Sequence, residues 1–398
     1  MLVGVAALNA GNYVFHLIAA RHLGPARYGD LATLVAISGL ISLPLGGVQV
    51  WVARSVAEYR AVGDDDAIHW FTRRVGSYLA VVATVVTLIL LALALPLQHV
   101  LGIASLAAVL LTGLTAFPAI VSSVTWGLAQ GLQRFGLTSL TYAAGPVARV
   151  GFTLLAFAVG LKVGGAMLAT LLAMGVGLLL PLWAMRTWFT PAPAAGRRIN
   201  RREAIRSLQP VVVGLLAITA LTTDDVVVAK LALSDHAAGI YGSASLIGRI
   251  VLYLPAAIVT VLLPRVAART AGRQASTDLL VKSAGVTAAF CAGLTTIYAL
   301  GGTLIARSAF GTSYDSAGPL LWRFGVAMSC FAVLNVLLFY HLGRGEHRLS
   351  WLLGGAALLQ LAAFAAAHGN GRQLVTVDVV FGTGLLLVYA LLGNRIRR

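Results

Sequence analysis

The feature that most limits the fold of this chain is a series of apolar segments, each about 20 residues long, that recurs from end to end. Such a segment crosses the hydrocarbon core of a bilayer as a helix, because a helix satisfies its own backbone hydrogen bonds where water is absent. Composition agrees, since 59% of the 398 residues are hydrophobic and only 11% are charged. The sequence therefore predicts an all-α polytopic membrane protein rather than a soluble domain.

We predict about twelve transmembrane helices, which account for most of the apolar content. In the first half of the chain the predicted spans are 2–22, 30–52, 76–97, 104–128, 136–159 and 164–185. In the second half they are 210–234, 239–263, 281–306, 318–342, 349–367 and 374–393. The two cysteines, Cys291 and Cys330, lie inside apolar runs and indicate packing rather than a disulfide or a metal site.

The distribution of Lys and Arg predicts the orientation of these spans. If the N-terminus is cytoplasmic, most of the 29 Lys and Arg residues fall in the inner loops and the C-terminal tail. Both termini are therefore predicted to be cytoplasmic, and the first span is expected to act as an uncleaved signal anchor. The formal net charge of +16 then reflects insertion topology and contact with anionic membrane lipids, and it does not indicate nucleic-acid binding.

A break in composition near the middle divides the chain into two parts. Residues 187–207 begin with a Pro-Ala stretch that is typical of a linker and end with an Arg-rich stretch that predicts a short helix on the inner membrane surface. We therefore predict two six-helix lobes joined by a basic cytoplasmic linker. Their bounds are 1–186 for the N-terminal lobe, 187–208 for the linker and 209–398 for the C-terminal lobe.

The two halves are weakly alike. Tyr28 and Gly29 of the first half align with Tyr241 and Gly242 of the second, and each half begins and ends on the same side of the membrane. This pattern predicts lobes related by a pseudo-two-fold axis along the membrane normal, with a substrate path between them. Chance similarity between apolar segments is the alternative explanation.

The stretch after the first span carries a more specific signal. It has the pattern Ala-Arg-x-Leu-Gly-Pro-x-x-Tyr-Gly, formed by Ala20, Arg21, Leu23, Gly24, Pro25, Tyr28 and Gly29. This signature resembles the one that follows the first span in the polysaccharide-type flippases of the multidrug/oligosaccharidyl-lipid/polysaccharide exporter superfamily. The resemblance extends over the twelve-span layout and is strongest over about 15–60 and 220–270.

The resemblance implies a transporter of a bacterial inner membrane. Such a flippase moves an oligosaccharide linked to a polyprenyl pyrophosphate to the outer face by alternating access, for export of cell-surface polysaccharide. A cationic cavity between the lobes would receive the sugar-pyrophosphate head group. No cofactor is expected, and H⁺, Na⁺ or the membrane potential would drive transport. A polysaccharide polymerase or glycosyltransferases are the protein partners that the resemblance implies.

Charges inside the seventh and eighth spans are the first candidates for the site. Asp225 and Arg249 lie at about the same depth, roughly 15 Å from the outer ends of two adjacent helices. One interpretation is a buried ion pair that joins the helices. The other is that Arg249 binds the pyrophosphate while Asp225 tunes it or carries a coupling ion. Asp224 points about 100° away from Asp225 and is a second ion-coupling candidate.

Three further arginines are candidates for binding the substrate anion. Arg149 lies deep in the fifth span, after Pro146, which we expect to kink the helix. Arg323 lies near the outer end of its span, so it can either bind substrate or extend toward the interface. Arg21 belongs to the signature and otherwise reads as a topology residue. For Arg149 the alternative to substrate binding is a structural pairing.

Several other functions compete with this reading. A drug/cation antiporter of the same superfamily would need an acidic and aromatic cavity, and a lipid II flippase usually has fourteen spans. A non-transport subunit or an enzyme of polysaccharide assembly is the alternative from a different class. A lipid-sugar enzyme would need a catalytic group in a large outer loop, and here the longest outer loop offers only Asp315. We therefore expect a protein without enzymatic activity.

Overall fold

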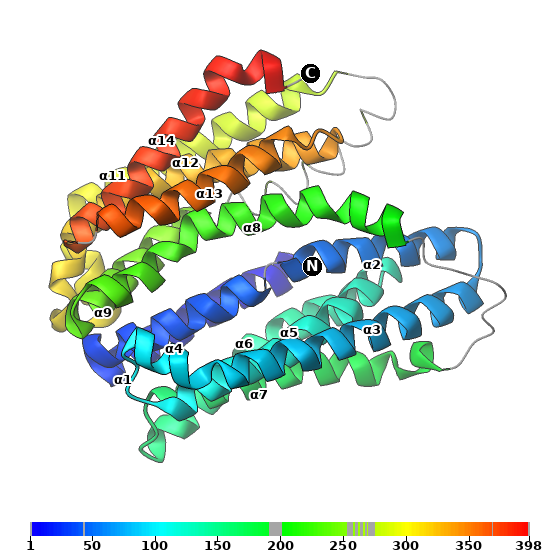
Figure 1. Cartoon of the computed structure of the whole chain (residues 1–398), viewed down its shortest axis with the longest axis horizontal. Helices are drawn as coiled ribbons and strands as arrows, with labels where there is room; N and C mark the ends of the chain where they lie inside the picture. Colours follow the sequence, from blue (N-terminus) through cyan, green and yellow to red (C-terminus); the bar gives the residue numbers. More distant parts are fainter. Residues whose placement is uncertain are drawn as a thin grey trace. The chain divides into compact units, whose positions relative to one another are not determined.

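A computed structural model describes residues 2–42, 44–190, 201–252, 275–367 and 369–396, together with Ile258, Leu262, Val266 and Arg269. Within these residues all regular secondary structure is helical, which confirms the predicted fold class (Figure 1). Among the described residues, ten helical stretches are long and apolar enough to cross a membrane. One of them, Ala7–Ala61, covers most of the first predicted span and all of the second. Most of the inner half of the predicted eighth span, beyond Leu252, lies outside the described residues.

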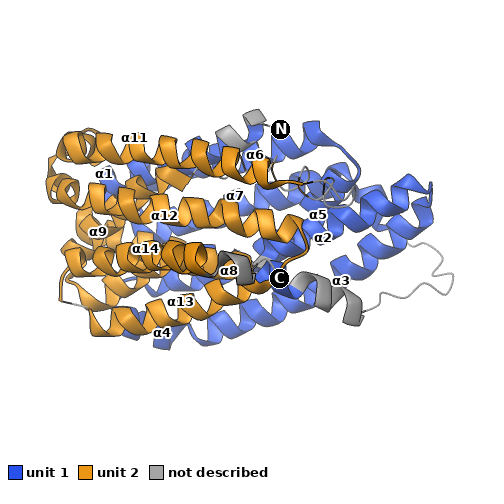
Figure 2. Cartoon of the chain, turned by 90° about the horizontal axis from the view of Figure 1, so that it is seen from above, with its two compact units in different colours: residues 1–23, 37–212 blue, residues 24–36, 213–398 orange. Residues whose placement is uncertain are grey.

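Contacts divide the chain into two compact units, coloured separately in Figure 2. Unit 1 comprises residues 1–23 and 37–212, and unit 2 comprises residues 24–36 and 213–398. The division near residue 212 lies close to the predicted linker. Residues 24–36, however, group with the second unit although they follow the first span directly. The predicted two-fold relation between the halves stays a prediction.

Unit 1 is built around α5, which packs against α2, α3 and α7. Small residues make the α2–α5 contact close, since a Cβ at Gly127 would lie 2.7 Å from the Gln49 oxygen and one at Gly131 would lie 2.7 Å from the Ala53 oxygen. The helices of this unit are α1 (Leu2–Ser42, shared with unit 2), α2 (Pro44–Ala61), α3 (Asp65–Ala92), α4 (Ala94–Leu101), α5 (Leu106–Gly131), α6 (Phe135–Ala158), α7 (Val163–Ala184) and η1 (Arg186–Phe189).

In unit 2 the helices α11 and α12 form the most extensive contact, and α14 packs on α12. Gly325 lets α12 approach α11, because a Cβ there would lie 2.8 Å from the Thr295 hydroxyl. The helices are α8 (Arg201–Ala232, shared with unit 1), α9 (Asp235–Gly248), η2 (Arg249–Leu252), α11 (Thr277–Phe310), η3 (Thr312–Ala317), α12 (Gly318–Gly343), α13 (Arg348–Ala366) and α14 (Gly371–Ile396). Of the Arg-rich part of the linker, predicted to be a short helix, residues 201–207 form the start of α8, and residues 191–200 lie outside the described residues.

The signature residues turn the chain at the junction of the two units. Gly24 has φ 72° and ψ 169°, a conformation that interrupts the helical path of α1 and that L side chains rarely adopt. Pro25 follows, where its fixed φ suits the start of a new helical segment. Beyond it, a Cβ at Gly29 would lie 2.9 Å from the Gly239 nitrogen, so the segment approaches α9 backbone to backbone. Gly24, Pro25 and Gly29 of the signature are thus explained by the geometry of a turn and a close helix contact.

Observed helices also run past several predicted ends. The third predicted span, 76–97, corresponds to α3, which starts eleven residues earlier at Asp65. The side chain of Asp64 caps this helix by accepting a hydrogen bond of 3.0 Å from the Ala67 nitrogen. Hydropathy marks only the lipid-facing part of such a helix, whereas the capping residue sets its start.

Candidate functional site

Arg149 occupies the interior of unit 1 and is only 9% exposed. It lies on the buried stripe of α6 that also carries Tyr142, Pro146 and Thr153, at the i, i+4, i+7 and i+11 positions of one helix face. The helix continues through Pro146, and the kink expected there stays a prediction. Pro146 packs directly against Gly11 of α1, which has no side chain to keep the two helices apart.

This helix contact brings α1 residues beside the guanidinium. Arg149 Nη1 donates to Asn12 Oδ1 at 3.2 Å, and its Nε donates to Thr170 Oγ1 of α7 at 3.0 Å. Its Cζ lies 3.5 Å from the centroid of the Phe15 ring. A hydroxyl, an amide and an aromatic face therefore fix the orientation of the cation without contributing a negative charge.

The sequence around Arg149 carries no acidic residue. Residues 2–23 and helices α5, α6 and α7 contain no Asp or Glu anywhere along their length. A charge at bilayer depth is costly and is kept where it faces a partner or a wet cavity. The role of Arg149 in binding the substrate anion stays a prediction.

Unit 2 contains the ion pair that depth counting anticipated. Arg249 Nη2 lies 3.0 Å from Asp225 Oδ1, and Ser245 donates to Asp225 Oδ2 at 3.2 Å. The Asp225 side chain is 1% exposed and that of Arg249 is 22% exposed. Of the two interpretations, pairing is the geometry that the structure shows. The roles of Arg249 in substrate binding and of Asp225 in ion coupling stay predictions, as does that of the half-buried Asp224.

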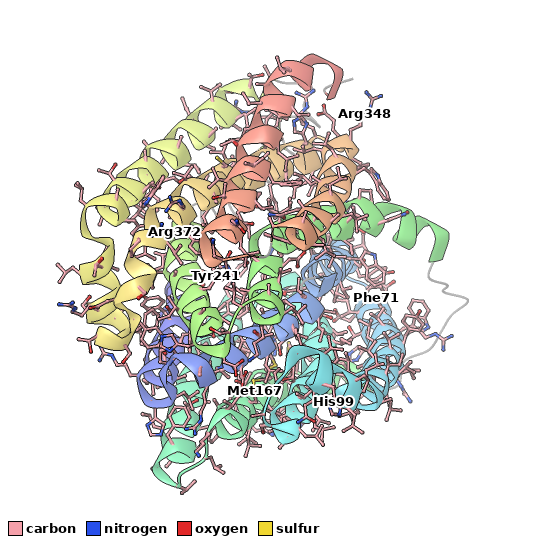
Figure 3. The ribbon with its side chains drawn as sticks, turned by 60° about the vertical axis from the view of Figure 1, so that its left-hand side comes forward. Phe71, His99, Met167, Tyr241, Arg348 and Arg372 are labelled. Atoms are coloured by element: carbon pink, nitrogen blue, oxygen red, sulfur yellow. The ribbon has the colours of Figure 1, made fainter. Side chains whose placement is uncertain are left out.

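A second carboxylate near this pair escaped the sequence analysis. Asp378 of α14 is fully buried and accepts a hydrogen bond of 2.7 Å from Gln360 of α13. It lies near Asp225 and near the buried Tyr241, which is labelled in Figure 3. The sequence could have indicated it, because Asp378 lies four residues inside the predicted span 374–393 and an acidic residue within a span is a candidate functional residue.

A third cluster joins residues 24–36 to the α8–α9 turn. Lys230 Nζ lies 2.5 Å from Asp30 Oδ1 and 2.5 Å from Asp235 Oδ1. Lys230 falls near the end of the predicted span 210–234, and its side chain is buried. Asp30 follows the signature in sequence, so the signal available was its place between Gly29 and the apolar run that begins at Leu31.

The remaining candidate arginines lie elsewhere. Arg323 is half-buried, stacks 4.5 Å from the centroid of the exposed Trp322 ring and donates to the Pro319 oxygen one turn earlier at 3.4 Å. This is the geometry of a side chain that extends toward the interface. Arg21 is exposed at the end of the first straight part of α1. The structure describes no contact that brings Arg323 to Arg149 or Arg249, and the binding roles of Arg21 and Arg323 stay predictions.

The fold of this chain is similar to those of several solved transporter structures. The fold is similar to an inward-facing multidrug resistance MATE family transporter of the MOP superfamily, with a TM-score of 0.79 and 16% identity over 98% of this chain and 94% of that one. It is also similar to the lipid II flippase MurJ in an inward closed conformation, with a TM-score of 0.76 and 10% identity over 99% of this chain and 88% of that one. A MOP superfamily transporter from Pyrococcus furiosus gives a TM-score of 0.70 and 16% identity over 100% and 94%.

Comparison of the sequence with known families identifies the family of this chain. No curated protein matches the sequence. A family model described as polysaccharide biosynthesis protein matches residues 3–270, which is more than half of the chain and includes the signature, Arg149 and the Asp225–Arg249 pair. The folds that the chain resembles are those of transporters. The apolar helices of the described residues are those of a multi-pass membrane protein, and the fold is similar to that of MOP superfamily transporters. The chain belongs to the polysaccharide biosynthesis protein family.

Proposed function

We propose that this transporter moves an oligosaccharide linked to a polyprenyl pyrophosphate from the inner to the outer face of a bacterial inner membrane, with both termini cytoplasmic. The observation that supports the proposal is Arg149, a buried cation oriented by Thr170, Asn12 and Phe15 among helices without acidic residues. A guanidinium offers donors in a planar fork that matches two oxygens of a phosphate. The similarity to a lipid II flippase supports a lipid-linked substrate.

Coupling is proposed to involve the carboxylates of unit 2. Asp225 and Asp378 are buried, Asp224 is half-buried, and Arg249 brings one positive charge to these three carboxylates. An excess of buried carboxylate favours uptake of H⁺ or Na⁺. The anion would then bind in unit 1 while the coupling cation binds in unit 2.

A drug/cation antiporter is the second candidate function. The acidic group around Asp378 and the similarity to MATE transporters favour it. The two candidates differ in what Arg149 does, because a cationic drug has no use for a buried cation. An enzyme of lipid-linked sugars is less well supported. Asp315 of the loop between the predicted spans 281–306 and 318–342 is bound by Arg307 through hydrogen bonds of 3.0 and 3.2 Å, and this contact lowers the pKa of its carboxyl.

Transport into liposomes tests the proposal. A polyprenyl pyrophosphate carrying a short oligosaccharide is supplied on one side, and its appearance on the other side is measured for wild type, Arg149→Gln and Arg249→Gln. Arg372→Gln is the matched control, because this exposed residue also loses one positive charge. We expect Arg149→Gln to lower the transport rate about 100-fold, corresponding to roughly 3 kcal/mol for a charge-assisted hydrogen bond. Uptake of a cationic drug that is insensitive to Arg149→Gln, together with no lipid transport by wild type, would instead support the antiporter.

A further inference from the structure

A neutral polar cluster lies in unit 1 around Tyr142, seven residues before Arg149 on α6. The amides of Gln49 of α2 and Gln130 of α5 both donate to the hydroxyl of Tyr142 of α6, each at 3.1 Å. The ring of Trp126 lies 5.0 Å from that of Tyr142 at 63°, and its Nε1 donates to the Gly177 oxygen at 3.0 Å. Three helices thus place two amides, a phenol and a fixed indole at one point.

The cluster keeps unused hydrogen-bonding capacity. Within the described residues, the side chain of neither glutamine forms a hydrogen bond other than the one to Tyr142. Neither amide oxygen is among the polar atoms that are sealed from solvent without a partner, and both side chains are only half-buried. Because the Tyr142 oxygen accepts from both amides, its own hydrogen can be donated. The cluster can therefore offer two carbonyl acceptors and one hydroxyl donor to a ligand.

Helix packing does not require these amides. The contact between α2 and α5 is already made by Gly127 and Gly131, which lie directly against the α2 backbone. Amides that only joined helices would be expected to use both their donor and their acceptor groups, since polar groups left unsatisfied at this depth are costly. Half-used amides beside a rigid aromatic ring are what a ligand with many hydroxyls would need.

The position of the cluster relative to Arg149 gives its chemistry. Tyr142 and Arg149 are seven residues apart on the same buried stripe of α6, which corresponds to about 10 Å along the helix. We infer that Gln49, Gln130, Tyr142 and Trp126 form a subsite for the sugar adjoining the pyrophosphate, an inference that rests on the proposed function. The amides and the phenol pair with sugar hydroxyls or an acetamido group, and the indole covers an apolar ring face.

Comparing the binding of a lipid with and without a sugar distinguishes the sugar subsite from the anion site. Purified protein in detergent is titrated with a polyprenyl pyrophosphate, and with the same lipid bearing N-acetylglucosamine, glucose or galactose. For wild type we expect at least one sugar to strengthen binding. Gln49→Leu and Gln130→Leu should each lower the affinity for the sugar-bearing lipid about tenfold, as expected for the loss of one or two hydrogen bonds. Neither variant should change the affinity for the sugar-free lipid. Arg149→Gln weakens binding of both lipids.

Controls distinguish a local effect from a loss of structure. Tyr142→Phe keeps the ring and removes only the hydroxyl, and it should reproduce the selective loss. Thr295→Val deletes a comparable interhelical hydrogen bond of 3.2 Å to Ser329 in unit 2 and should change neither affinity. A thermal unfolding midpoint within a few degrees of wild type confirms that each variant is folded.

The outcomes bear differently on the two proposals. Equal weakening of both lipids by the glutamine variants, or no effect on either, overturns the sugar subsite. If Arg149→Gln still weakens both lipids in that case, the anion site of the proposed function survives. If wild type binds neither lipid, both the subsite and the proposed function are wrong.

Discussion

Replacing Lys230 by Met is predicted to destabilise unit 2 strongly. The Lys230 side chain is 1% exposed and lies between two carboxylates, Asp30 at 11% exposure and Asp235 at 63%. Methionine fills a similar volume but leaves the carboxylate of Asp30 buried without its cation. Residues 24–36 are held to α8 and α9 by this ion pair and by the close backbone contact at Gly239. Loss of the lysine should therefore release that segment.

The two halves of the cluster contribute unequally. Removing one partner of a buried ion pair costs about 3–5 kcal/mol, because the other charge is left in a medium of low dielectric. The exposed Asp235 adds only about 0–1 kcal/mol, since solvent screens it. We therefore expect Lys230→Met to lower the free energy of unfolding by about 3–5 kcal/mol, and Asp235→Asn to lower it by less than about 1 kcal/mol. The double variant Lys230→Met/Asp30→Leu should recover most of the loss, because neither charge remains buried.

Denaturant titration in detergent micelles measures these differences. The control is Arg54→Met, which removes an exposed i, i+4 pair with Glu58 and should change the free energy of unfolding by about 0.5 kcal/mol or less. A Lys230→Met variant as stable as Asp235→Asn would refute the buried pair. So would a double variant no more stable than Lys230→Met alone, because burial of an unpaired charge would then not be the source of the loss.

Three other substitutions test separate parts of the structure. Gly239→Ala should lower the stability measured by thermal unfolding by about 1–3 kcal/mol, because its Cβ would meet a backbone oxygen of the facing helix. Gly151 has open space around it, so Gly151→Ala should be neutral or stabilising by up to about 1 kcal/mol. Asp224→Asn/Asp225→Asn should make transport independent of pH if these groups exchange protons, and an unchanged pH profile would exclude them. Arg149→Lys should keep more transport activity than Arg149→Gln but less than wild type, since lysine retains the charge without the planar fork, and equal activity of Lys and Arg would argue against two-oxygen recognition.

Features that depend on one or two helices could be predicted from the sequence. Hydropathy indicated the spans, and counting residues from the helix ends placed Asp225 and Arg249 at one level, where the structure pairs them at 3.0 Å. The same counting did not reveal Asp378. Asp378 comes 153 positions after Asp225 in the chain. Only the packing of α14 brings the two residues together, and the periodicity of a sequence does not show which helices pack against each other.

The ion pair of Lys230 could not be predicted, for a similar reason. Within its own helix Lys230 misses the i+3 and i+4 spacing to Asp224 and Asp225, so the spacing indicated no carboxylate partner for it. Its partner Asp30 comes from the segment that leaves unit 1 at Gly24, and the signature showed that this turn exists without showing what it contacts. The sugar subsite escaped for the same reason, because Gln49, Gln130 and Tyr142 belong to three helices.

Charge at membrane depth is distributed differently in the two units, and this difference constrains the proposed mechanism. Residues 2–23 and helices α5, α6 and α7, which surround Arg149, contain no carboxylate, whereas in unit 2 Asp224, Asp225 and Asp378 lie near Arg249. An anion bound in unit 1 and a cation bound in unit 2 would each relieve a charge imbalance of its own unit. Coupling between them must then pass through conformation and must be reciprocal. If H⁺ or Na⁺ changes the affinity for the lipid-linked sugar by some factor, the lipid must change the affinity for the cation by the same factor, and Arg149→Gln should abolish the second effect along with the first.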